Sequence, residues 1–306
     1  KKFSYDNEKF LEFLNKNGFY MPDKTFSTFG STPDELNLIL NMDYPISSGW
    51  VSDAYQDLKT NKVMSTFSDQ NYSVIETNSA MRWKDFSDVD THLCYDVDFI
   101  NSEFLDQVLR KSIIRYFMEQ HQTDTRRDIV RCTFNELSEI ALQSNGPTYV
   151  FAHLYVPHPP FIFGPNGENV TPDHSEISGL QSWENPQGYL NQLIYATSEI
   201  SVVITNIVEN DPNAIIILQG DTGTLTGTDI STTTIKDIYQ SHSILYAVRI
   251  PDVNNFENAI PVNTYRIIFN NYFDMNYEYL EHRIYMANEN NTLTDVTKTI
   301  YEYRFG

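Results

Sequence analysis

Apolar residues follow two patterns along the chain, one typical of helices and the other of buried strands. A spacing of three and four residues predicts helices at 6–17, 32–42, 54–62, 100–143, 189–209 and 263–272. Runs of β-branched and aromatic residues predict strands at 19–21, 72–76, 148–156, 213–219, 243–250 and 300–303, with 148–156 and 213–219 buried on both faces. This alternation favours an α/β domain, with a mostly parallel central sheet and helices on both of its faces.

The segment 157–187 interrupts this pattern, because it holds six of the 13 prolines. We expect it to be a long irregular loop and to act as a lid or a partner surface, since loops of that length are usually functional or disordered. No repeat divides the rest, so residues 1–306 are expected to form a single domain. The chain begins at Lys1 rather than at Met, and we expect it to be a piece of a longer protein.

Local residue types predict where the first two helices begin and end. Asp6 is the expected N-cap of the first helix, and Gly18 its C′ residue. Thr32 and Pro33 predict the start of the second helix, with the threonine at the N-cap and the proline at the first helical position. The Thr/Ser/Gly-rich segment 24–31 between them is expected to be a loop.

Composition and charge exclude several classes of protein. Hydrophobic residues make up 41% of the chain, which excludes disorder of the whole. A net charge of −20 opposes binding to nucleic acids and to anionic lipid surfaces. No apolar run approaches the roughly 20 residues of a membrane-spanning helix, so any membrane attachment is expected to lie outside this chain.

Two features bear on the compartment. Cys94 and Cys132 could form a disulfide or remain two buried thiols, and neither has the Cys/His spacing of a zinc site. Asn-x-Ser/Thr sequences at Asn71, Asn169 and Asn290 are either glycosylation sites or chance occurrences in an Asn-rich chain. Together with the acidic surface, they favour the extracytoplasmic face of a membrane or the cell surface.

Three polar segments fall where an α/β sheet of this kind places its ligands, at the ends of strands and the starts of helices. Thr32 could be a nucleophile, a hydrogen-bond donor that holds a phosphate or sulfate, or only a helix cap. His153 and His158 flank the end of a predicted strand, where a histidine can bind a metal or protonate a leaving group; either could instead be structural. Asp221 follows a buried strand, as metal ligands often do, or it caps a turn.

Taken together, these segments resemble the sulfatase-like branch of the alkaline phosphatase superfamily, and in particular the soluble domains of its membrane-anchored bacterial and archaeal members. Four stretches carry the resemblance: Asp6–Leu11 with Asn17-Gly18-Phe19, Thr32–Tyr44, Phe151–His153 with Pro157–Phe161, and Pro261–Asn270 with Tyr272-Phe273. The match spans nearly the whole chain and is weakest over 50–140.

The resemblance implies a metal-dependent hydrolase or transferase of phosphate or sulfate esters. Thr32 falls on the nucleophile position, which is also a metal ligand, and His158 on the histidine that contacts the anionic group. His153 is a weaker candidate beside the substrate. Asp221 and Thr222 fall on the metal-binding Asp-His of an Asp-His-Gly motif. The expected cofactor is one divalent ion, Mn, Mg, Ca or Zn, and the expected partner is an anionic ester.

Two departures from the family pattern leave a second function open. Thr222 replaces the histidine ligand, and a neutral hydroxyl suits Mg²⁺ or Ca²⁺ better than a transition metal. The family's first strand, with its metal-binding Asp, has no counterpart here. No lysine or arginine falls at a motif position. The alternative is therefore a catalytically inactive domain, with no metal, that serves binding or assembly in a membrane-anchored extracytoplasmic protein. A third interpretation limits the resemblance to the fold.

Overall fold

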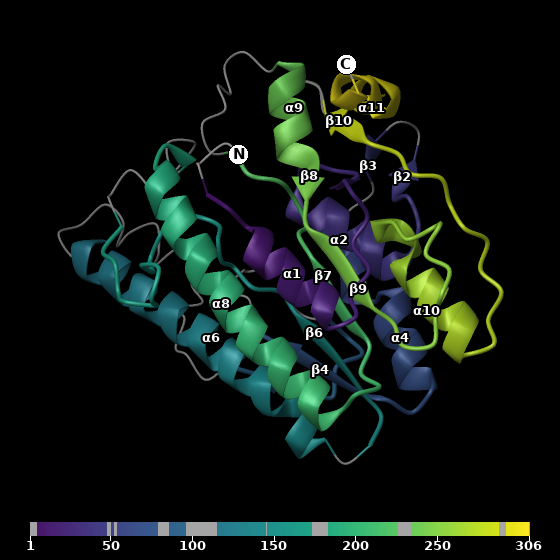
Figure 1. Cartoon of the computed structure of the whole chain (residues 1–306), viewed down its shortest axis with the longest axis horizontal. Helices are drawn as coiled ribbons and strands as arrows, with labels where there is room; N and C mark the ends of the chain where they lie inside the picture. The colour runs from purple at the N-terminus through teal and green to yellow at the C-terminus, as the bar shows by residue number, and fades with distance from the viewer. Residues whose placement is uncertain are drawn as a thin grey trace.

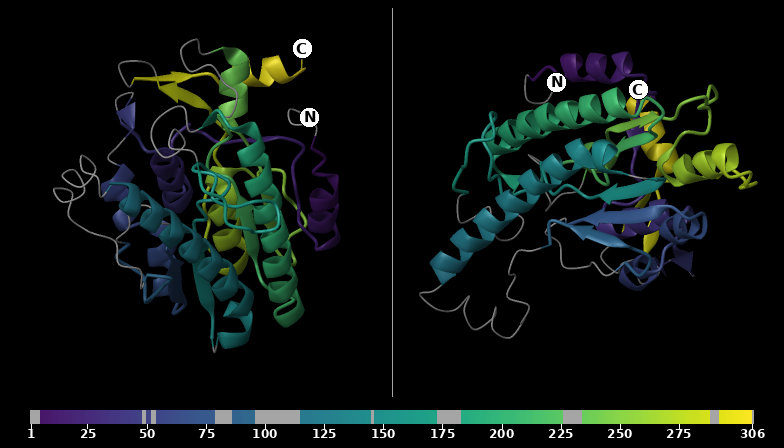
Figure 2. Two further views of the ribbon diagram at one scale, coloured as in Figure 1. Left: turned by 90° about the vertical axis from the view of Figure 1, so that its left-hand side faces the viewer. Right: turned by 90° about the horizontal axis from the view of Figure 1, so that it is seen from below.

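A computed structural model describes residues 5–47, 50–51, 54–78, 86–95, 115–144, 146–172, 183–225, 234–287 and 292–305. Strands lie between two groups of helices (Figures 1 and 2). On one side, α6 (Arg115–Gln143) packs along α8 (Pro186–Asn210), and α1 (Glu8–Lys16) lies beside α8. The other side carries α2 (Thr32–Asn41), α3 (Ala54–Lys59), α4 (Lys62–Asp69) and α10 (Thr264–Tyr272). The predicted α/β class is confirmed.

The strands form small sheets of different kinds. Strands β5 (Thr91–Leu93), β4 (Ser73–Thr77) and β6 (Thr148–Ala152) pair in parallel, in that order. Strand β7 (Ile216–Gln219) pairs antiparallel with β9 (Tyr246–Arg249), and Tyr20 adds a bridge to Val248. Parallel pairing in the described part of the chain is limited to β5–β4–β6. The predicted mostly parallel central sheet is therefore not confirmed.

Three further antiparallel pairs lie outside these sheets: β1 (Thr25–Phe26) with β8 (Ser243–Ile244), β2 (Ile46–Ser47) with β3 (Trp50–Val51), and β10 (Tyr285–Ala287) with β11 (Leu293–Asp295). Strand β1 lies inside the segment that was expected to be a loop. Only two of its residues pair, which is too short for a pattern of alternating side chains to show in the sequence.

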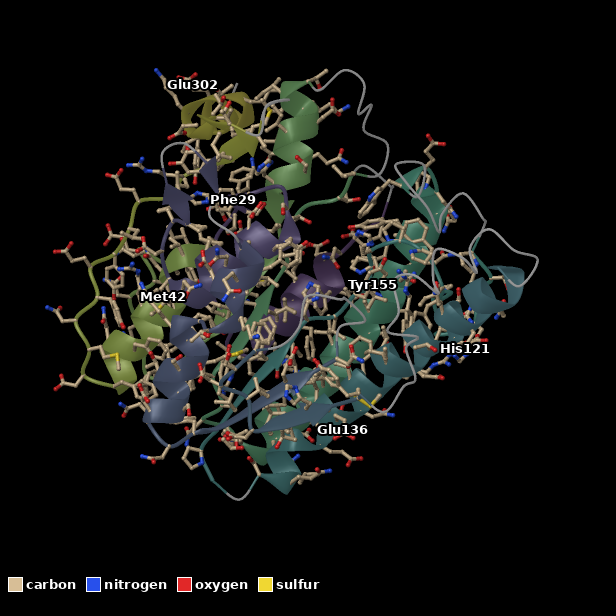
Figure 3. The ribbon with its side chains drawn as sticks, turned by 180° about the vertical axis from the view of Figure 1, so that it is seen from behind. Phe29, Met42, His121, Glu136, Tyr155 and Glu302 are labelled. Carbon is tan, nitrogen blue, oxygen red and sulfur yellow. A yellow bond between two sulfur atoms is a disulfide. The ribbon has the colours of Figure 1, made fainter. Side chains whose placement is uncertain are left out.

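A large apolar core fixes α2 in the molecule. Leu38, Leu40 and Met42 are almost fully buried, and they pack in one cluster with residues of α4, β4, β9 and α10. Each such side chain contributes about 1.5–3 kcal/mol by leaving water. Phe29 and Met42 lie at the two ends of this helix (Figure 3). Helix α2 is thus held in place by packing rather than by its cap alone.

Several boundaries differ from the sequence-based predictions. Ser31, and not Thr32, is the N-cap of α2, and Asn7, and not Asp6, is the N-cap of α1. Gly18 follows α1 with φ +81°, as expected of a C′ residue. Strands β6 and β7 are shorter than expected, and most of their residues are only half-buried.

The predicted last strand at 300–303 is wrong, because this segment belongs to helix α11 (Thr297–Phe305). Val296 and Ile300 are four residues apart and are buried in one cluster with Phe26 and Ile284, which is a helical contact. Helix α9 (Ile235–His242) and the short 3-10 turn at Pro261–Asn263 complete the order of elements. Of the predicted helical segment 100–143, residues 100–114 lie outside the described residues.

Cys94 and Cys132 form a disulfide with an S–S distance of 2.06 Å. This decides between the two alternatives that the sequence left open. The bond joins the end of β5 to α6, two elements that otherwise belong to different layers. Within the described residues, no helix is long and apolar enough to cross a membrane.

Candidate functional site

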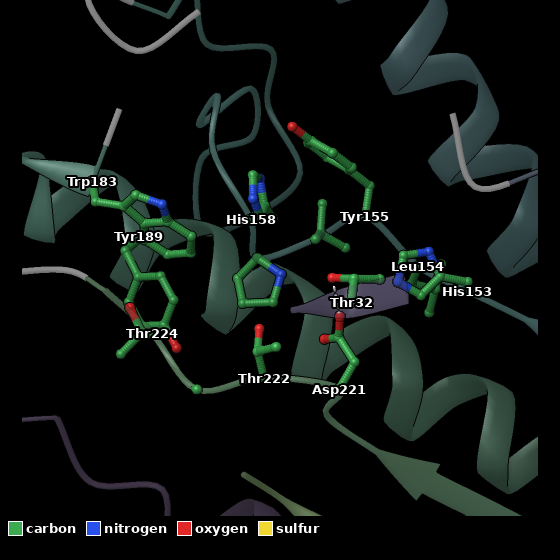
Figure 4. Close-up of a pocket in the computed structure, with 13 residues that line it drawn as sticks. Thr32, His153, Leu154, Tyr155, His158, Trp183, Tyr189, Asp221, Thr222 and Thr224 are labelled. Atoms are coloured by element: carbon green, nitrogen blue, oxygen red, sulfur yellow. Dashed lines mark hydrogen bonds between the residues drawn. The ribbon is translucent and has the colours of Figure 1, made fainter. Parts of the chain in front are cut away.

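The segments that follow β6 and β7 meet the start of α2 at a pocket of about 100 Å³ (Figure 4). All five residues singled out from the sequence line it: Thr32, His153, His158, Asp221 and Thr222. Pockets for drug-sized ligands are larger, roughly 300–1,000 Å³. This pocket therefore has room for one small chemical group, and the rest of a larger ligand would extend outside it. The roles of the five residues stay predictions.

Thr32 and Asp221 form the centre of the site. The Thr32 hydroxyl donates a hydrogen bond to Oδ2 of Asp221, and the two side chains face each other in Figure 4. Because Ser31 occupies the N-cap position, the interpretation of Thr32 as only a helix cap is wrong. Its hydroxyl is instead aimed at a carboxylate that can accept its proton.

His158 lies at the mouth of the pocket, with one side open to solvent. Its Nδ1 is 2.6 Å from the carbonyl oxygen of Pro159. A carbonyl only accepts, so Nδ1 carries the proton, and Nε2 of the neutral ring is an acceptor. Protein atoms on the closed side desolvate the ring, and this lowers the pKa of His158 below 6.5. At neutral pH, the ring therefore cannot donate from Nε2 to an anion.

Two aromatic rings contact the ring of His158. The Tyr155 ring centroid is 4.9 Å from that of His158, and the Trp183 centroid is 5.0 Å away at an edge-on angle of 74°. Tyr189 lies beside Trp183, on the side of the pocket opposite Asp221 (Figure 4). Sequence reasoning missed these three residues. Tyr155 stands in the quoted histidine segment, whereas Trp183 and Tyr189 carry no pattern that marks them.

Two buried side chains position the segment that carries His158. Gln192 of α8 donates from Nε2 to the His158 carbonyl at 2.9 Å, and its Oε1 accepts from the Ile162 amide at 2.9 Å. Arg127 of α6 donates from Nε to the Ile162 carbonyl at 3.1 Å. The start of the Pro-rich segment 157–187 is thus fixed by both long helices, while 173–182 lies outside the described residues.

A second carboxyl group, that of Glu35, lies close to Asp221. Glu35 is fully buried in α2, and its Oε2 accepts from the Phe29 amide at 2.8 Å. Burial raises the pKa of Glu35 well above 4.5, and the charge of Asp221 adds to this effect. A neutral Glu35 keeps a second negative charge away from Asp221, which favours the approach of an anion.

Gly223 lines the pocket next to Thr222. A Cβ atom at this position would lie 2.1 Å from the Gln240 carbonyl oxygen and 2.8 Å from that of Ser243. Its amide donates to the Ser241 carbonyl at 2.7 Å. Only glycine fits so close to the end of α9, and this contact sets the course of the backbone at Asp221 and Thr222.

The donor set at the pocket is rich in oxygen atoms, from the Asp221 carboxylate and the hydroxyls of Thr32 and Thr222, and the imidazoles of His153 and His158 also line it. Among the residues that the structure describes, no group of three or more His, Cys, Asp or Glu side chains could hold a metal. Zinc sites usually take three or four ligands from His, Cys, Asp and Glu side chains, and the described residues do not assemble such a set. An ion that prefers oxygen, such as Mg²⁺, would take most of its ligands from water or substrate.

The comparisons with known proteins give a fold. No protein-family model and no curated protein sequence matches the chain. The C-terminal periplasmic domain of EcEptC from Escherichia coli, solved in complex with Zn, is similar over 95% of this chain and 86% of its own, with a TM-score of 0.60 and 12% identity. A second structure of that domain gives a TM-score of 0.58 over the same shares, again at 12% identity. At this identity, the likeness shows the fold alone.

Proposed function

We propose that this chain transfers or hydrolyses a phosphate or sulfate ester at the Thr32 pocket. The observation that carries the proposal is the hydrogen bond from the Thr32 hydroxyl to Asp221, inside a small pocket that His158 also lines. The motif resemblance and the fold shared with EcEptC support it. The same two observations support an extracytoplasmic location, with attachment to a membrane through segments outside this chain. The net charge of −20 argues against a role in binding nucleic acids.

In this mechanism, Thr32 is the nucleophile and Asp221 the base. Asp221 takes the hydroxyl proton as Oγ1 forms a bond to phosphorus or sulfur, and the ester oxygen leaves with the electron pair of the broken bond. The leaving oxygen gains its proton from His158 when that ring is protonated, or from water. A water or an acceptor alcohol then attacks the Thr32 ester and releases the enzyme. No step is assigned to a metal, because the described residues do not assemble a set of metal-ligating side chains.

Two chromogenic esters test this proposal. 4-Nitrophenyl phosphate and 4-nitrophenyl sulfate release a coloured product on attack, and intact-mass analysis detects an adduct on Thr32. Thr32→Val keeps the shape and removes the hydroxyl, so it should abolish both signals, whereas Thr32→Ser should retain them. Thr28→Val is the matched control, because the Thr28 hydroxyl is buried and finds no hydrogen-bond partner in the described structure. Turnover by Thr32→Val equal to that of wild type would refute the nucleophile.

The second candidate is binding of the same ester without turnover. It is favoured by Thr222, which stands where the resemblance implies a histidine, and by the neutral state of His158. Under this alternative, wild type binds phosphate or sulfate but releases no product, and Thr32→Val binds as tightly as wild type. The domain would then serve recognition or assembly.

A further inference from the structure

The guanidinium of Arg126 lies one ring away from the pocket and carries a buried donor with no partner among the described residues. Arg126 is on α6, and its Cζ is 5.3 Å from the centre of the Tyr155 ring, which lines the pocket. Its Nε is buried and has no hydrogen-bond partner in the described structure. Figure 3 shows Tyr155 between α2 and α6. The cation therefore stands one aromatic ring away from His158 and the pocket.

Other arginines of this chain satisfy their guanidinium groups within the protein. Arg127, the next residue, binds Asp124 and two carbonyl oxygens. Arg131, one turn further on, binds the Gly167 carbonyl and Asn169, and its Cζ lies 5.2 Å from the centre of the Phe163 ring. Arg249 and Arg266 each donate to several backbone carbonyls. Arg126 shares the ring contact but lacks the acceptor.

An unpaired buried donor is costly, above all on a cation. The chain carries 41 acidic residues, yet none of the described ones pairs with this guanidinium. Natural proteins retain such costs mainly at functional sites. A guanidinium presents its donors as a planar fork, which matches two oxygens of a phosphate or sulfate group. The missing acceptor thus has the chemistry of an oxyanion.

We propose that Arg126 binds the anionic, non-bridging oxygens of the ligand whose ester group enters the Thr32 pocket. This supplies the positive charge that the pocket lining lacks, since the lining contains no lysine or arginine among the described residues. Tyr155 holds the guanidinium plane against the pocket wall by a cation–π contact. The inference rests on the proposed function only in taking this pocket as the ligand site.

Anion binding measured by calorimetry tests the assignment, with inorganic phosphate, sulfate, methyl phosphate and dimethyl phosphate as probes. Arg126→Gln should weaken the binding of the anions by about tenfold or more, because charge-assisted hydrogen bonds are lost. Arg126→Lys keeps the charge but not the planar fork of donors, so its affinity for the anions should lie between those of wild type and Arg126→Gln. Arg131→Gln is the matched control: it lies on the same helix and also contacts a ring, but it already has protein acceptors.

If Arg126 only stabilised the fold, Arg126→Gln would melt at a lower temperature than wild type. Removing a buried donor that has no partner should leave the melting temperature of Arg126→Gln at or above that of wild type, whereas Arg131→Gln should melt lower. Sulfate should raise the melting temperature of wild type by mass action and leave that of Arg126→Gln unchanged. Equal affinity of wild type and Arg126→Gln for all four anions, or no binding of any of them to wild type, would overturn the inference.

The inference and the proposed function can fail separately. Loss of anion binding in Arg126→Gln supports this inference even if neither nitrophenyl ester is turned over. Turnover that depends on Thr32, with unchanged anion affinity in Arg126→Gln, keeps the proposed function and refutes the role of Arg126.

Discussion

The Thr32 hydroxyl donates to the carboxylate of Asp221, a residue 189 positions further along the chain. The bond joins the start of α2 to the end of β7 and occupies one of the two carboxylate oxygens. The donor set that remains for a cation is therefore small. In the proposed mechanism the same bond readies the threonine for attack, so the pair bears both on metal binding and on the proposed catalysis.

The first prediction concerns this donor set. Thr222→His adds an imidazole beside Asp221, and we expect it to raise the affinity for Zn²⁺ and Mn²⁺ by at least about tenfold, because these ions favour nitrogen ligands. Calorimetry with Mg²⁺, Ca²⁺, Mn²⁺ and Zn²⁺ measures the gain, and Asp221→Ala should remove it. Thr224→His, on the opposite side of the pocket, is the control. No gain over wild type would show that the site is not arranged around a cation.

The second prediction concerns the protonation of His158. Desolvation lowers the pKa of His158 below 6.5, so the ring becomes a donor at Nε2 only below that pH. We expect sulfate affinity to rise as the pH falls below 6.5, by about tenfold. Sulfate is the probe because its own charge does not change in this range. His158→Gln should give a flat profile, and a rise of the same size in that variant would contradict the role of the histidine.

The third prediction concerns the backbone at Gly223. Alanine there would place Cβ 2.1 Å from the Gln240 carbonyl oxygen, and the strain should lower the free energy of unfolding by about 1–3 kcal/mol. It should also displace Asp221 and Thr222 and so reduce turnover and anion binding. Gly220→Ala is the matched control, because the nearest atom to its Cβ would be 3.5 Å away on Ile244. Urea unfolding of both variants measures the difference.

The fourth prediction concerns Glu35. Burial raises the pKa of Glu35 in the folded chain. Its protonated form therefore contributes its full stabilisation below about pH 4.5, the usual pKa of a glutamate. This contribution is lost as the pH rises through the pKa of Glu35 in the folded chain. Glu35→Gln stays neutral and keeps the acceptor for Phe29. Its free energy of unfolding should exceed that of wild type by a margin that widens from pH 4.5 to pH 8. A constant margin, like that expected of the exposed Glu12→Gln, would mean that burial does not raise the pKa of Glu35 in the folded chain.

Sequence reasoning could locate the centre of the site because its residues follow apolar strands. His158 and Asp221 come after two such segments, and Thr32 starts a helix, which are the places where α/β sheets bring polar groups together. It could not find Arg126, Trp183 or Tyr189. Trp183 and Tyr189 line the pocket and Arg126 lies beside it. They come from long helices or from a short turn, where nothing local separates a ligand contact from a solvated side chain or from packing.

The errors in the fold also have physical causes. The segment Ile300–Tyr303 is rich in tyrosine, which favours strands, but the contact of Ile300 with Val296 and Phe26 made it helical. The sequence of strand β7 predicts a buried parallel strand, but the strand pairs antiparallel with β9. The apolar character of a strand shows that its faces are buried. Whether the neighbouring strand runs parallel or antiparallel depends on the connection between the two strands, which the residues of one strand do not encode.

The disulfide between Cys94 and Cys132 has a consequence for when the domain matures. Cys132 lies on the same helix as Arg126, six positions away, so α6 and its cation are tied to β5 only after the two thiols are oxidised. Closing a loop of this length is worth about 3–4 kcal/mol, and thiols stay reduced in the cytosol. We expect a newly made chain to gain its full affinity for sulfate only after it reaches an oxidising compartment. Sulfate binding measured before and after mild reduction would show this dependence, and equal affinities would disprove it.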